Sequence, residues 1–297
     1  MNKKMNLRVL TLNIWLAPRD QQKRDALLLK GLEEHDADIV FLQEVLRTPE
    51  RDAFQLVKEN SSLHWHHASD FARHASDFAD FEWPLWGTAV GTRWEPKSIT
   101  THKLPAADGP YVWEAVLSLP IGVDMLFLGP RPSFNFTDEA ARVEQALFVT
   151  ELEEKRRQEA PTIIAGDFDA APDQDCMRFY TGKSAINGRS AAFRDTWAIA
   201  GDGGPGYTWT TDSPWVARSV TDGQGIVPNY VVQEPHHRRI DYVLAGSTVN
   251  HLTVESVINS SKVVFNEYPT ASDHYGVLAE IELNALDKPT AAEIGWA

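Results

Sequence analysis

The sequence contains a single cysteine, Cys176, among 297 residues. An internal disulfide is therefore excluded, and the fold must be held by its core alone. No run of 18 or more apolar residues occurs, which excludes a helix long enough to span a bilayer. The first residues lack the apolar stretch and cleavage site of a secretory signal, so a cytoplasmic location is the expectation.

Basic residues are also scarce, with 28 Lys and Arg against 42 Asp and Glu and a formal net charge of −14. The field of the whole molecule repels polyanions, so a nucleic-acid substrate is disfavoured unless a local patch or a metal holds it. The one basic run, Lys155 to Arg157, stands beside several glutamates and is typical of the solvated face of a helix.

Hydrophobic residues make up 43% of the chain, and their spacing alternates between strand-like and helix-like segments. The pattern predicts about ten strands and five helices, including helices from Asp20 to Asp36 and from Asp138 to about Gln158, the second capped by Thr137. No linker-like break interrupts this pattern. We therefore expect one α/β domain over residues 1–284, followed by a short tail over residues 285–297.

A seven-residue near-duplication lies in the first third of the chain. HASDFAR, from His67 to Arg73, is followed by HASDFAD, from His74 to Asp80. The tryptophans and the proline that flank it indicate an excursion between strands. We expect a loop or a short helix near the mouth of a site.

Five apolar strands end in acids, amides or an acid–histidine pair. The five endings are Asn13, Gln43-Glu44, Asp167-Phe168-Asp169, Asp241 and Asp273-His274. Each ending alone has a structural explanation, such as a turn, a helix cap or a buried ion pair. Side chains at neighbouring strand ends of an α/β fold converge on one edge, where ligands bind. Five such endings together therefore favour a functional site.

The order of these segments resembles the endonuclease/exonuclease/phosphatase superfamily of DNase-I-like enzymes. The matching segments are LTLNIW, IVFLQEV, IIAGDFD, RRIDYVLAG and SDHYGVLAEI, which span residues 10 to about 282. The resemblance implies a four-layer α/β/β/α sandwich, in which two mixed β-sheets pack face to face with helices outside. It also implies a Mg²⁺ or Mn²⁺ site held by Glu44 with help from Asn13 and Asp273, since hard cations prefer oxygen ligands.

The resemblance assigns roles to three further residues. His274 would lie against the substrate phosphate. Asp241 would fix the imidazole ring of His274 and favour its charged form. Asp167 would orient or deprotonate the attacking water.

Two positions depart from the family pattern. Relatives usually carry a histidine in an Asn-Thr-His-Leu segment, where this chain has Gly129-Pro130-Arg131-Pro132. Arg131 cannot transfer a proton, yet it can clasp a phosphate or carboxylate. Asn135 is a candidate to serve in the place of the histidine, whereas His102 lies on an earlier strand and is interpreted as structural.

The second departure is GDFD in place of GDFN, which puts Asp169 two residues from Asp167. A second carboxylate there would repel an anionic substrate and raise the pKa of one acid, unless a cation lies between them, and it could create a second metal position. The leading hypothesis is hydrolysis of a phosphodiester or phosphomonoester of a small or lipid-like molecule. Alternatives are a biosynthetic enzyme with other metal-dependent chemistry, and a non-catalytic binding protein; nuclease activity is disfavoured.

Overall fold

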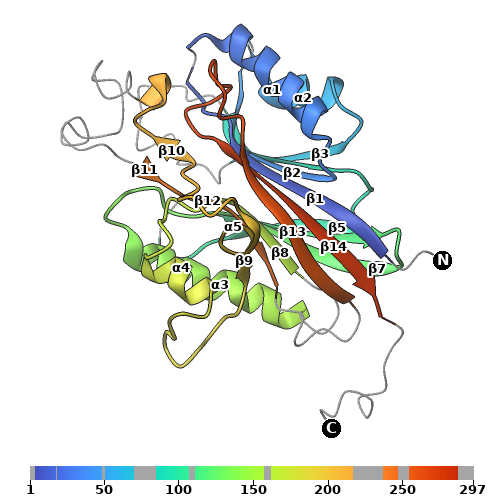
Figure 1. Cartoon of the computed structure of the whole chain (residues 1–297), viewed down its shortest axis with the longest axis vertical. Coiled ribbons are helices and arrows are strands. Elements are labelled where there is room, and N and C mark those ends of the chain that lie inside the picture. The colour runs from blue at the N-terminus through green and yellow to red at the C-terminus, as the bar shows by residue number, and fades with distance from the viewer. Residues whose placement is uncertain are drawn as a thin grey trace.

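Two β-sheets form the centre of the protein in a computed structural model of the chain (Figure 1). The structure describes residues 4–17, 19–48, 51–69, 85–106, 111–156, 162–216, 237–246 and 254–286. Within this part of the chain, no helix is both long enough and apolar enough to cross a membrane.

The first sheet has six strands in the order β13-β14-β1-β2-β4-β3. Its strands are β1 (Lys4–Asn13), β2 (Ile39–Arg47), β3 (His64–Ser69), β4 (Leu85–Thr92), β13 (Val254–Val264) and β14 (Gly276–Ala285). Strands β1 and β2 are parallel, and the other neighbours are antiparallel. The central strand β2 is buried along nearly its whole length, as its continuous apolar run predicts.

The second sheet also has six strands, in the order β5-β6-β7-β8-β12-β9. Its strands are β5 (Ser98–Lys103), β6 (Tyr111–Leu119), β7 (Val123–Arg131), β8 (Thr162–Asp167), β9 (Arg194–Asp195) and β12 (Asp241–Ala245). Strands β7 and β8 are parallel, so this sheet is mixed as well. A separate two-stranded ribbon joins β10 (Trp209–Thr210) to β11 (His237–Arg238).

Helices α1 (Gln21–His35) and α2 (Ala53–Glu59) cover the outer face of the first sheet, and α3 (Glu139–Arg156) and α4 (Asp175–Tyr180) cover that of the second (Figure 1). Helix α5 (Thr196–Ala200) instead packs against β13 of the first sheet and β12 of the second. One apolar cluster lies between the sheets and includes Phe41 and Phe127. A second cluster packs the second sheet against α3 and α4, and a third packs the first sheet against α1 and α2. These three cores confirm the predicted α/β/β/α sandwich.

The structure agrees with most of the predicted elements and differs at three points. The helix predicted from Asp138 begins at Glu139. The described residues hold 14 strands rather than about ten, because β9, β10 and β11 are two-residue strands that carry no periodic signal. Residues His67 to Ser69 of the duplicated segment belong to β3, so the prediction of a loop or helix is wrong there, and the rest of that segment lies outside the described residues.

Candidate active site

The polar segments singled out in the sequence meet where one end of the first sheet faces the second sheet. Only Asn13 and Asp167 end strands as predicted; Glu44 lies within β2, Asp241 begins β12, and Asp273-His274 precede β14. Asn13 is the last residue of β1 and pairs in register with Gln43 of β2. The next residue, Glu44, lies in an irregularity of β2 and has a φ of +57°. A positive φ is costly for a glutamate and is typical of residues held in place at functional sites. On the second sheet, Asp167 ends β8 and faces Asp241, the first residue of β12.

Asn13 joins the two sheets through its side-chain amide. The Nδ2 group donates to Glu44 Oε1 at 3.1 Å and to Asp167 Oδ2 at 3.0 Å. The Oδ1 atom accepts a hydrogen bond from the Trp15 backbone N–H at 2.9 Å. The side chain of Asn13 is buried, and its bond to Asp167 is shielded from water. One amide thus fixes two carboxylates relative to each other.

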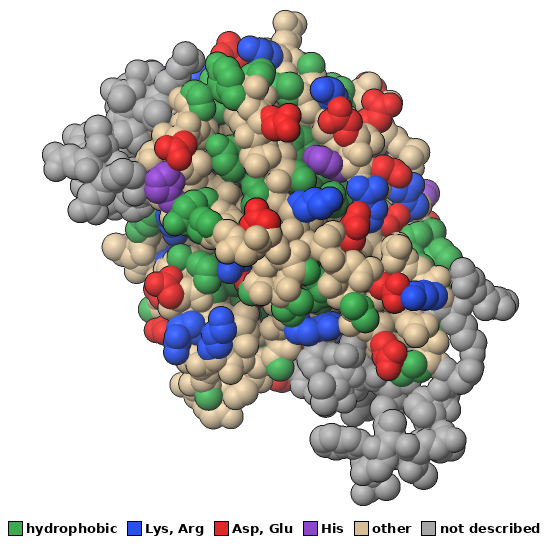
Figure 2. Space-filling model, viewed as in Figure 1, with side chains coloured by type: hydrophobic (Ala, Val, Ile, Leu, Met, Phe, Trp, Pro, Cys, Tyr) green, Lys and Arg blue, Asp and Glu red, His purple; other side chains and the backbone are tan. Residues whose placement is uncertain are grey.

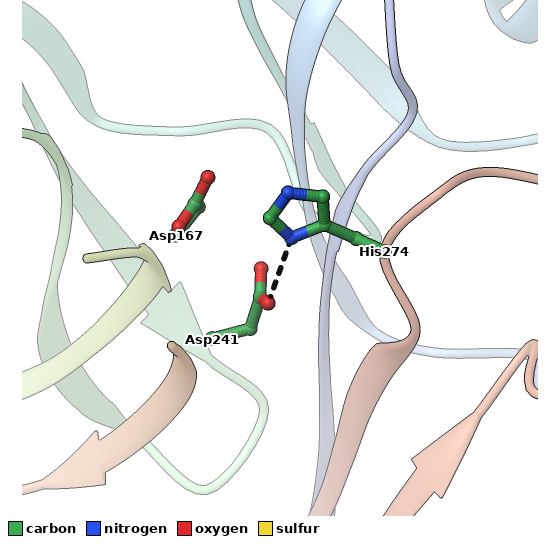
Figure 3. Close-up of side chains that lie close together, drawn as sticks. All are labelled: Asp167, Asp241 and His274. Atoms are coloured by element: carbon green, nitrogen blue, oxygen red, sulfur yellow. Dashed lines mark hydrogen bonds and ion pairs between the residues drawn. The ribbon is translucent and has the colours of Figure 1, made fainter. Parts of the chain in front are cut away.

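His274 and Asp241 form a buried ion pair, in which Nδ1 and Oδ2 are 3.0 Å apart (Figure 3). Burial alone would lower the pKa of His274, but the charges of Asp241 and Asp167 outweigh it and raise this pKa well above the ordinary value. Burial raises the pKa of Asp241 to about 6, although the charge of His274 opposes the shift. The second carboxylate oxygen of Asp241 is buried and has no hydrogen-bond partner among the described residues.

Asp167 faces this ion pair from the neighbouring strand (Figure 3). Ligand atoms of Asp167, Asp241 and His274 all lie within 4.8 Å of one another, so this group could hold a metal ion. Asp167 Oδ1 also accepts a hydrogen bond from the Asp169 backbone N–H at 3.0 Å. Both oxygens of Asp167 are therefore oriented by named donors.

Asp273 lies next to His274 on the segment that leads into β14. Burial raises the pKa of Asp273, and the nearby charge of Glu44 raises it further, while His274 and Arg24 oppose the shift. Ser272 anchors the segment, because its hydroxyl donates to the Asn13 carbonyl at 2.6 Å and accepts from the His274 N–H at 3.2 Å. The three residues predicted to bind a metal therefore lie close together: Asn13 donates to Glu44, and the charge of Glu44 acts on Asp273.

The two departures from the family pattern lie close enough to interact. Arg131 ends β7, and its charge lowers the pKa of Asp169, as do Arg238 and His274. Burial and the charge of Asp167 act more strongly in the other direction and raise the pKa of Asp169 well above its ordinary value. Asp169 has a φ of +51°, and its carbonyl accepts from Arg238 Nη2 at 2.9 Å.

The other two side chains considered for proton transfer lie in different surroundings. Asn135 is exposed, and its amide donates to Asp138 Oδ2 at 3.0 Å, before α3. Its amide is thus held beside the start of α3 rather than by one of the described site residues. His102 Nε2 lies 2.8 Å from Glu114 Oε2, and the same glutamate binds Arg156. This agrees with the structural role expected for His102.

Several residues that shape the site were not predicted. The Arg24 guanidinium donates to the Ala271 carbonyl, and the Arg238 guanidinium donates to the Asp169 carbonyl. The Thr208 hydroxyl accepts from the Asp241 backbone N–H. Arg24 lies inside a charged helical segment, where its sequence neighbours carry no sign of burial. Ser272, by contrast, directly precedes a predicted motif and could have been found from that position.

Residues 10–274 match the model of the Endonuclease/Exonuclease/phosphatase family, and this range contains all the site residues described above. The chain belongs to this family. Its members are metal-dependent hydrolases of phosphoester bonds, so the protein is an enzyme of that class. No curated protein matches the sequence. The buried group of Asp167, Asp241 and His274 offers two carboxylates and an imidazole, and with one unpartnered oxygen on Asp241 among the described residues it fits a divalent cation.

Solved structures share the fold at low sequence identity. The catalytic domain of human Nocturnin with bound sulfate is 16% identical, with a TM-score of 0.67 and 94% of each chain covered. D. rerio TDP2 in complex with a single-strand DNA product is 18% identical, with a TM-score of 0.68 over 93% of this chain and 98% of that one. A family protein from Bacteroides thetaiotaomicron is 15% identical, with a TM-score of 0.66 over 94% and 98%.

Proposed function

We propose that the protein is a magnesium-dependent phosphoesterase that hydrolyses a phosphodiester or phosphomonoester of a small or lipid-like molecule. The observation that carries this proposal is the contact of Asn13 with both Glu44 and Asp167 beside the His274–Asp241 ion pair. A metal site, a water-orienting carboxylate and an imidazolium are three groups that together can promote phosphate-ester hydrolysis.

Glu44, Asn13 and Asp273 are the residues that would hold Mg²⁺, or Mn²⁺ in its place. The carboxylates of Glu44 and Asp273 suit a hard cation that keeps part of its hydration shell, and the Asn13 amide, which donates to Glu44 Oε1, would hold one of them in place. When bound, the metal would offset the negative charge that develops on the phosphate. The Asp167, Asp241 and His274 group offers a second position, and metal stoichiometry distinguishes the two arrangements.

The chain's own residues supply the remaining steps. Because Nδ1 of His274 is engaged by Asp241, Nε2–H is the group left to donate to a phosphate oxygen. Asp167, oriented through both of its oxygens, would align the attacking water and accept its proton. These two groups act on opposite partners of the reaction, the phosphate and the nucleophile.

In this proposal, Arg131 and Asp169 together replace the histidine that relatives carry, one by binding the substrate and the other by donating a proton. Arg131 stays protonated and would hold a substrate oxygen, but it cannot protonate a leaving group. Asp169 can hold a proton because burial and the charge of Asp167 raise its pKa. We assign Asp169 as the donor to the leaving group, a role that a carboxyl with a raised pKa can fill near neutral pH.

A small or lipid-like substrate fits the charge and the surroundings of the site better than a polynucleotide. The net charge is −14, and on the face shown in Figure 2 basic and acidic side chains are interspersed. The half-buried Trp15 and the 39% exposed Phe136 offer apolar contact area near the site. TDP2 has been seen with a DNA product, so a short nucleic acid is an outcome that the test must include.

The test is a screen of phosphomonoesters, phosphodiesters, phospholipid headgroups and short oligonucleotides with Mg²⁺, with Mn²⁺ and with a chelator. We expect metal-dependent turnover of at least one small phosphoester and weaker turnover of the oligonucleotides. If no phosphoester is cleaved under any condition, the proposal fails. If oligonucleotides are the best substrates, the substrate class is wrong.

A second candidate function is metal-dependent chemistry of another kind, in a biosynthetic pathway. The observation that favours it is the pair of departures, Arg131 and Asp169, which lie on the same side of the site and influence each other. A binding protein without activity would show metal binding but no turnover. We also propose residues 1–284 as one domain, and a cytoplasmic location stays a prediction of the sequence.

A further inference from the structure

Arg24 is an almost fully buried arginine, 2% exposed, in the first turns of α1. Its guanidinium donates five hydrogen bonds, all to backbone carbonyls. Nη2 reaches Ile14 at 2.6 Å and Trp15 at 2.6 Å, Nη1 reaches Ala17 at 2.7 Å and Arg19 at 3.2 Å, and Nε reaches Ala271 at 2.9 Å. Burying a charge costs folding free energy unless its hydrogen-bond donors are satisfied, and these five bonds satisfy the guanidinium of Arg24.

The carbonyls that Arg24 binds belong to two segments that are far apart in sequence. Four of them lie on the turn directly after Asn13, and the fifth, on Ala271, precedes Ser272 and Asp273. The fork of donors on one guanidinium is what allows a single side chain to hold both segments. Arg24 therefore ties together the segments of two of the three proposed metal ligands.

The same turn also positions Glu44, the third ligand. The Leu16 backbone N–H donates to Glu44 Oε2 at 3.0 Å, and the Trp15 N–H donates to Asn13 Oδ1 at 2.9 Å. Trp15 has a φ of +56°, a strained conformation for a tryptophan, and the Arg24 guanidinium lies 4.5 Å from the centre of its ring. Arg24 thus binds the carbonyls of the same turn whose backbone N–H groups hold Asn13 and Glu44.

We propose that Arg24 is a positioning residue for the metal site, acting through the 14–17 turn and the 271–273 segment on Asn13, Glu44 and Asp273. The proposal rests on the metal-dependent function above. It goes against simple electrostatics, because a cation near Asp273 and Glu44 should weaken the binding of another cation. Removing the charge alone would tighten metal binding, whereas losing the positioning weakens it.

The test is Mn²⁺ affinity, measured by titration followed by electron paramagnetic resonance, without any substrate. We expect Arg24→Met to raise the Mn²⁺ dissociation constant by about 10- to 100-fold, the usual cost of losing a group that orients metal ligands. Arg24→Lys keeps the charge but loses the fork, and we expect it to raise the constant about 10-fold. This variant decides the question if Arg24→Met does not fold.

Arg194→Met is the matched control, because Arg194 also donates to backbone carbonyls, those of Gly246 and Ser256. It lies beside Ala245, at the end of β12 opposite Asp241, far from the site. We expect a lower melting temperature but an unchanged Mn²⁺ affinity. Unchanged or tighter Mn²⁺ binding by folded Arg24 variants would overturn the inference. Absence of Mn²⁺ binding by the unaltered protein would instead overturn the proposed function.

Discussion

The two sheets contribute differently to the site. The segments of the first sheet carry Asn13, Glu44 and Asp273, and all three agree with the family pattern. Two strands of the second sheet, β7 and β8, lead into Arg131 and Asp169, and both residues depart from it. In the proposed function, the residues that would hold the metal, the retained half of the site, keep the sequence pattern, while those that would face the substrate and its leaving group, the altered half, depart from it. This difference leads us to propose retained metal chemistry with an altered substrate or proton donor.

Glu44→Ala should have the largest effect, since it removes the principal proposed metal ligand from the retained half. We expect Mg²⁺-dependent turnover to fall about 10⁴-fold, because the metal's stabilisation of the transition state is worth several kcal/mol. Initial rates with a generic phosphodiester measure the effect. Glu33→Ala, on the exposed face of α1, is the control and should keep full activity. A variant at Glu44 that keeps its turnover would show that the two halves are not divided in this way.

Asp241→Asn tests the ion pair between Asp241 of the second sheet and His274, which precedes β14 of the first sheet. In the unaltered protein, turnover should fall as the pH drops through about 6, since protonation of Asp241 removes the carboxylate charge that holds the His274 ring in the ion pair. In the variant that carboxylate charge is absent, so the pKa of His274 is lower than in the unaltered protein and the imidazolium is lost at a lower pH. We expect a loss of about 10³-fold at pH about 8 and a smaller one at pH about 6.

The pH profile of kcat/KM provides the measurement for Asp241→Asn. Asp212→Asn is a matched control, because Asp212 is an exposed acid 3.7 Å from His237. Its profile should overlay that of the unaltered enzyme. Equal losses at every pH in Asp241→Asn would mean that Asp241 acts without setting the charge of His274.

Asp169→Asn restores the family's residue in the altered half. If Asp169 protonates the leaving group, the variant should lose about 10²-fold with alkyl leaving groups. It should lose little with p-nitrophenolate, which departs without a proton. The measurement is the ratio of rates for the two substrates, and equal losses with both would refute the assignment.

Arg131→His restores the other missing residue and should have the smallest effect. We expect kcat/KM to fall about 10-fold, mainly through KM, since a bidentate clasp on the substrate is lost. Arg131→Lys should retain part of the activity. A rise in phosphoesterase activity in Arg131→His would mean instead that the arginine marks decay of the original site.

The fold could be predicted, and the polar segments of the candidate site could be listed, because both follow from local sequence patterns. Strand β2 contains a continuous apolar run, and the polar residues that end β1 and β8, follow the apolar run of β2 or precede β14 stand out against such runs. Arg24 could not be predicted, because its burial depends on carbonyls of the 14–17 turn, of Arg19 and of Ala271, which lies 247 residues away. The same holds for Arg238, whose partner Asp169 lies 69 residues away.

The central claim is that Glu44, Asn13 and Asp273 hold the metal, and crystals soaked in Mn²⁺ test it directly through the anomalous signal. We expect an anomalous peak within about 2.2 Å of a Glu44 carboxylate oxygen. A further peak among Asp167, Asp241 and His274 would add a second metal without removing the first. A peak at that group alone, or no peak at either position, would contradict the account.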